Sequence, residues 1–164
     1  MLSTLILINY FVFIKITNKM WANYDYSQEP IIKVEFEKNI SKEEDFNEFL
    51  KEWIKLYEQK KDFFFILDTR NVGLIKMKYV NKMVKFIKKM KLFEYQYLQK
   101  SIIIVDNTII RYLLNIIFKL TKPLATVHIV SNKTILDDFN NIENKEQYYN
   151  IIETNINKIS TVNP

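Results

Sequence analysis

Three short apolar runs, separated by segments of helical length, constrain the fold of this chain more than any other feature. The runs are Phe63–Leu67, Ile102–Val105 and Val127–Val130, and each is apolar at nearly every position. Strands of this composition are buried on both faces, as in a parallel sheet that helices cover. Because crossover connections between parallel strands are right-handed and need an intervening helix, the pattern predicts three adjacent parallel strands in one sheet.

The remaining elements complete an α/β domain around these strands. Residues 23–27 and 31–37, which flank Pro30, predict a hairpin. Apolar residues at helical spacing predict helices over about 41–59, 76–90 and 109–120, the first opening with the capping box Ser41-Lys42-Glu43-Glu44. Further helices are predicted over 133–140 and 146–156. We therefore expect a single α/β domain with a mixed, mostly parallel sheet of four to five strands covered by about four helices.

The domain is expected to span residues 20–156. Before it, residues 2–14 are apolar but fall short of the roughly 20 residues that cross a bilayer. This segment can be an extra strand, a weak membrane anchor, or an extension upstream of a start at Met20, and we favour the third interpretation for residues 1–19. After the domain, residues 157–164 are polar and are expected to fray.

Composition argues against several kinds of catalytic site. The 164 residues include no cysteine, one glycine (Gly73) and one histidine (His128). Thiol chemistry, cysteine-bound metals and glycine-rich phosphate loops are therefore excluded. His128 falls in an apolar strand, where a core histidine is more common than a catalytic one. We expect no enzyme activity, no metal and no cofactor.

Polar residues follow two of the predicted strands and form the first candidate site. Asp68-Thr69-Arg70-Asn71 ends one strand, and Asp106-Asn107 ends the next. The carboxyl ends of strands are where open α/β sheets place their ligands. The same residue types also form turns and caps through side-chain-to-backbone hydrogen bonds. The segment is thus either a partner-binding rim or a set of structural turns.

A lysine stripe is the second candidate. Lys78, Lys82, Lys85 and Lys89 recur at steps of four, three and four, so they share one side of a helix. Such a stripe can bind anionic lipid headgroups, or it can simply be a solvated face. Nucleic acid is disfavoured as a partner because no aromatic residues alternate with the lysines on that side.

With these elements in place, the chain resembles the STAS domains, the fold of anti-sigma-factor antagonists and of cytoplasmic domains of sulfate transporters. The resemblance rests on the order β–β–α–β–α–β–α–β–α and on a strand that ends in Asp68 before a helix. Residues 101–131 are also similar to the second half of CRAL-TRIO lipid-transfer domains, through Asn107, an apolar helix and the turn Lys122-Pro123. Together the two resemblances cover roughly residues 30–140.

The departures from these families shape the functional hypothesis. Where STAS antagonists present a phosphorylatable serine, this chain has Ile75-Lys76-Met77-Lys78-Tyr79, so no regulatory phosphate is expected over 73–79, and Thr69 is the nearest hydroxyl. Residues 1–164 contain no counterpart of the helical lobe with which CRAL-TRIO proteins enclose a lipid, so a closed lipid cavity is not expected. The resemblance therefore implies a cytoplasmic, non-catalytic module that binds a protein partner. The alternative is a CRAL-TRIO-like protein that binds a lipid or an anionic membrane surface.

Overall fold

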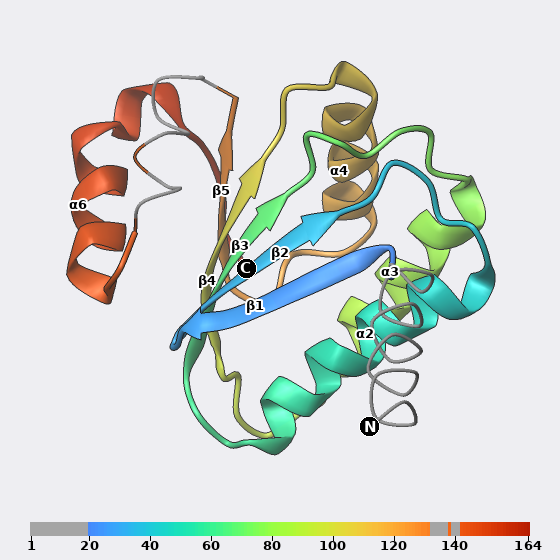
Figure 1. Ribbon diagram of the computed structural model, residues 1–164, viewed down its shortest axis with the longest axis horizontal. Coiled ribbons are helices and arrows are strands. Elements are labelled where there is room, and N and C mark those ends of the chain that lie inside the picture. The colour runs from blue at the N-terminus through green and yellow to red at the C-terminus, as the bar shows by residue number, and fades with distance from the viewer. Residues whose placement is uncertain (1–19, 132–137, 139–141) are drawn as a thin grey trace, which may run out of the picture.

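The computed structural model describes residues 20–131, 138 and 142–164, and Figure 1 shows their arrangement. The amino-terminal extension over 1–19 and nearly all of the helix predicted over 133–140 lie outside the described residues. The α/β fold predicted from the sequence is confirmed.

A six-stranded mixed sheet forms the centre of the molecule, and its strands lie side by side in sequence order. Strand β1 pairs with β2 in an antiparallel sense, β2 to β5 are parallel, and β6 runs antiparallel to β5. The prediction of three adjacent parallel strands is therefore confirmed for β3, β4 and β5. The strands are β1 (Ala22–Gln28), β2 (Ile31–Phe36), β3 (Phe63–Asp68), β4 (Leu98–Ile104), β5 (Thr126–Val130) and β6 (Ser160–Val162).

The helices divide unequally between the two faces of the sheet. Helices α2, α3 and α4 are the crossovers between the parallel strands, and all three cover one face, while α6 lies on the other (Figure 1). The helices are α2 (Glu43–Glu58), α3 (Met77–Met90), α4 (Thr108–Leu120) and α6 (Lys145–Thr154), followed by a short 3-10 turn, η1 (Ile156–Lys158). None of the helices in the described ranges combines the length and apolar character of a membrane span.

Successive side chains of β3 point to opposite faces of the sheet and so belong to two separate hydrophobic cores. Phe65 is fully buried against the three-helix layer, and its neighbour Phe64 is 1% exposed on the α6 side. On the α6 side Phe64 packs against Tyr148, with ring centroids 5.2 Å apart. Because successive side chains of a strand point to opposite faces, an apolar run fills both cores at once. This explains why the β3 run has no polar position before Asp68.

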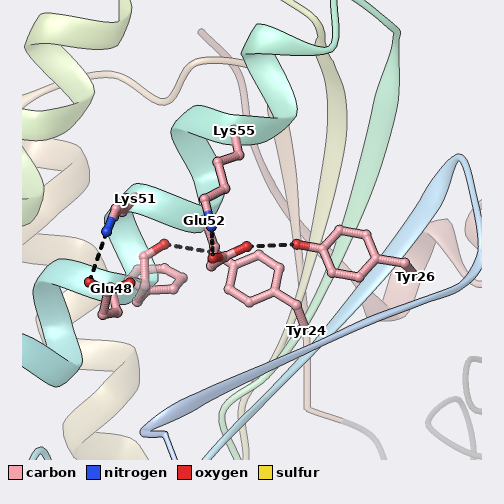
Figure 2. Close-up of polar contacts among 7 residues, drawn as sticks. Tyr24, Tyr26, Glu48, Lys51, Glu52 and Lys55 are labelled. Carbon is pink, nitrogen blue, oxygen red and sulfur yellow. Dashed lines mark hydrogen bonds and ion pairs between the residues drawn. The ribbon is translucent and has the colours of Figure 1, made fainter.

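Edge strand β1 is fastened to α2 by two tyrosines (Figure 2). The Tyr24 hydroxyl donates to the Phe49 carbonyl at 2.9 Å, and the Tyr26 hydroxyl donates to Glu52 at 3.2 Å. Glu52 also pairs with Lys55, one turn further along α2, at 2.5 Å. Burial, followed by the Glu52 charge, raises the pKa of Tyr26 to about 12. Both hydroxyls therefore remain protonated donors at neutral pH.

Two details differ from the sequence-based expectation. The N-cap of α2 is Lys42 rather than Ser41, because Asp45 and not Glu44 reaches back to accept the Lys42 amide at 3.1 Å. Residues 160–162, expected to belong to a fraying tail, form β6 instead. Val162 adds an apolar side chain to the three-helix core. This packing stabilises a strand whose composition is otherwise mostly polar.

Tyr148 supplies a test of the smaller core. Its side chain is fully buried, burial raises the pKa of its hydroxyl, and that hydroxyl has no partner among the described residues. A buried hydroxyl without a hydrogen bond costs about 1–3 kcal/mol.

We expect Tyr148→Phe to leave the free energy of unfolding in urea unchanged or to raise it by about 1 kcal/mol. Tyr148→Ala, which also removes the ring, should lower it by about 3–5 kcal/mol. A loss above about 1 kcal/mol in Tyr148→Phe would show that the hydroxyl is satisfied.

Candidate functional site

The carboxyl ends of β2, β3 and β4 form a charged rim, which we define as Glu35, Asp68, Arg70 and Asp106. Parallel register aligns Glu35 of β2 with Asp68 of β3, and Asp68 with Ile104 of β4. Asp106 follows β4 at the same edge. Three carboxylates thus gather around a single guanidinium. Sequence analysis did not include Glu35, because only the register of β2 against β3 shows that it joins this group.

Within this rim, Asp68 holds Arg70. The Arg70 backbone amide donates to Asp68 Oδ1 at 3.1 Å, and its Nε donates to Oδ1 at 2.9 Å. Its Nη2 donates to Oδ2 at 2.5 Å. These bonds raise the pKa of Arg70, and the charges of Asp106 and Glu35 raise it further. The guanidinium is therefore held in one orientation, and no hydrogen bond or ion pair of its Nη1 is found in the described part of the chain.

The other predicted site residues fall into two groups: some bond the backbone within a turn or cap, and others are exposed to solvent. Thr69 joins two strand ends, since its hydroxyl donates to the Ile104 carbonyl at 2.6 Å and its amide donates to the same oxygen at 3.1 Å. Asn107 is the N-cap of α4, its side chain accepting the Ile109 amide at 2.8 Å. Asn71 and Asp106 are exposed. The turn interpretation thus holds for Thr69 and Asn107, while Arg70, Asn71 and Asp106 face solvent at the rim.

Gly73, the chain's one glycine, anchors the loop that leaves the rim. Its amide donates to the Lys38 carbonyl at 2.7 Å, which ties the loop before α3 to the loop before α2. A Cβ at this position would lie 3.0 Å from that carbonyl oxygen and 3.2 Å from Asn39 Oδ1. A side chain would push the two loops apart, so glycine permits the close approach that fixes the rim.

The lysine stripe is partly neutralised by α2. Lys78 Nζ lies 2.9 Å from Glu43 Oε2, and Lys82 pairs with Glu43 Oε1. Lys82 also donates to Asn47 at 3.2 Å. Lys85 and Lys89 make no ion pair within the described ranges. The stripe is therefore a clasp between two helices at one end and a solvated face at the other.

The clasp can be tested by titration. Hydrogen bonds from Lys82 and Lys78 lower the pKa of Glu43 from its ordinary value to about 2. A carboxylate with a lowered pKa stabilises the fold above its unfolded-state pKa, and that contribution is lost as the pH falls toward 2. We expect carboxyl NMR to give a Glu43 pKa near 2 that rises toward its ordinary range in Lys78→Gln/Lys82→Gln. Lys88→Gln, on the same helix, is the matched control. An unchanged Glu43 pKa in the double variant would exclude the clasp.

His128 behaves as a core histidine. Its side chain is 4% exposed, and its Nδ1 lies 3.2 Å from the Thr161 hydroxyl of β6. Burial and the nearby charge of Lys100 lower its pKa, so the ring is neutral at pH 7. No group of three or more acidic or histidine side chains with metal-binding geometry occurs in the described part of the chain.

Helix α4 is buried on one side and exposed on the other. Ile110, Leu113 and Ile117 are buried against the sheet. Tyr112 and Leu120 remain 64% and 52% exposed. The helix therefore presents apolar side chains to solvent while its opposite side completes the core.

Comparison of the chain with protein-family models, with curated proteins and with solved structures finds no match.

Proposed function

We propose that this chain is a non-catalytic, STAS-like interaction module that binds a protein partner at the charged rim. The single observation that carries the proposal is Arg70: Asp68 binds this surface guanidinium through Nε and Nη2, and its Nη1 donors make no hydrogen bond among the described residues. Arginine is enriched among the residues that dominate binding energy in interfaces. An arginine already fixed in orientation loses little side-chain entropy on binding, which favours affinity.

The charges around Arg70 indicate the kind of partner. Glu35, Asp68 and Asp106 exceed the charge of the one guanidinium, so the rim is acidic on balance. A partner carboxylate would be repelled by them, whereas a backbone carbonyl could accept from Nη1 without that cost. The partner we propose places a main-chain carbonyl on Arg70 and basic side chains against the surrounding carboxylates.

The element order and the resemblance to STAS domains support this function and a cytoplasmic location for it. The strands and helices over residues 22–130 follow the first eight elements of the order on which the resemblance rests. The alternative, binding to an anionic membrane surface, draws less support, because Glu43 already engages two of the four lysines that would make the contact.

A cross-linking experiment tests the proposal. A photoreactive amino acid at the exposed position Asn71 should form an adduct with one protein in the native cell, and the same group at Lys88 should not. After purification of that protein, Arg70→Ala should weaken its affinity at least about tenfold. Lys88→Ala should leave the affinity unchanged.

Two results would contradict the proposal. One is an adduct that forms equally from Asn71 and Lys88. The other is an affinity that does not change in Arg70→Ala although the variant keeps its fold by circular dichroism. Flotation of the chain with phosphatidylserine vesicles, lost on changing Lys85 and Lys89 to Gln, would support the membrane-surface alternative instead.

A further inference from the structure

An apolar, partly open cavity of about 160 Å³ lies within the three-helix layer, and at one end its wall reaches Thr69, next to the charged rim. Its walls come from the sheet and from α2, α3 and α4, and they include Trp53, Val80, Leu113 and Val127. Side chains around an unfilled space lose the dispersion contacts they would make with a neighbour. A cavity of about 150 Å³ with similar walls, engineered in another protein, stays dry and binds benzene. The space here is thus the size of one compact ring.

The cavity approaches the surface at the seam between α3 and α4. Most of its wall residues are buried. Among the half-buried ones, Met83 of α3 and Leu114 and Phe118 of α4 lie at this seam, while Thr69, Ile75 and Leu124 lie in the loops at the ends of the helices. These two helices contact each other along the seam. Methionine is unbranched and adapts its shape easily, so Met83 can move without displacing a helix. The seam therefore offers a route by which a small molecule can enter.

The cavity wall holds the indole N–H groups of Trp21 and Trp53, each buried without a hydrogen-bond partner among the described residues. Ser101 is a further polar group of this wall. It lies on β4 with Phe65 and Val127 as its register neighbours, is 4% exposed, and belongs to the wall. No hydrogen bond of its hydroxyl is found among the described residues, whereas the Thr69 hydroxyl, also in the wall, is bonded to Ile104. Burying a hydroxyl without a partner is unfavourable, and an apolar side chain of similar size would avoid that cost.

We propose that this cavity binds a compact apolar molecule of about benzene size that carries a single hydroxyl or carbonyl group, with that group hydrogen-bonded to Ser101. The apolar part of the ligand supplies the dispersion contacts that the walls lack, and its polar group satisfies the serine. A cavity of this volume is too small for the acyl chain of a membrane lipid, so the ligand class differs from that of a lipid-transfer protein. The site shares no residue with the charged rim.

The chain carries its own reporter for this site. Its two tryptophans, Trp21 and Trp53, both line the cavity. Titration with phenol and with benzene, followed by tryptophan fluorescence and by calorimetry, should give saturable binding of both. We expect a phenol Kd of about 1 mM or tighter and a benzene Kd at least about tenfold weaker. Ser101→Ala should bring the two affinities within about twofold of each other while benzene still binds.

Filling variants locate the binding within the cavity. Ala125→Leu fills it from the sheet side and Val80→Phe from α3, so that one informative variant remains if the other fails to fold. Either folded variant should abolish the fluorescence response. Asn115→Leu, on the exposed side of α4, and Lys88→Ala, on the exposed side of α3, should leave it unchanged.

Three outcomes would overturn the inference. The first is the absence of saturable binding of either compound to the wild-type chain. The second is binding that survives in a folded filling variant. The third is an equal affinity for phenol and benzene in the wild-type chain, which would remove the role given to Ser101.

Discussion

The burial of β3 on both of its faces is the constraint on which the rest of this structure depends. Phe65 and Phe64 point in opposite directions, one into the three-helix core and the other toward α6, and neither is more than 1% exposed. A strand with no solvated face must have a neighbour on each side and a layer above and below. The crossover helices on one side and α6 on the other follow from that requirement.

The same constraint produces the charged rim. The apolar run of β3 ends at Asp68, the first residue of the strand that reaches water, and the parallel register places the ends of β2 and β4 beside it. Thr69 then ties this end to β4 through two bonds to the Ile104 carbonyl. The rim therefore continues from the core, and Arg70 is oriented by its hydrogen bonds to Asp68 at the end of the buried strand.

How much was predictable depends on whether a feature is local in sequence. The strands β3, β4 and β5 and the helices between them follow from apolar runs and helical periodicity, which act over a few residues. Features that depend on distant residues were not predictable. Val162 joins the core only after η1 reverses the chain, Glu43 meets Lys78 across two helices, and Glu35 reaches the rim through register alone. The cavity likewise arises from how three helices pack, which no single segment encodes.

Native-state hydrogen exchange tests most directly whether the rim is rigid because the core is. The Thr69 amide donates to Ile104 at 3.1 Å, and the Val105 amide donates to Val130 at 2.8 Å, each just beyond the end of its strand. We expect both amides to exchange with opening free energies within about 1 kcal/mol of that of Phe65, as members of the same cooperative unit. Exchange of Thr69 and Val105 at rates typical of exposed loops, while Phe65 stays protected, would contradict the account.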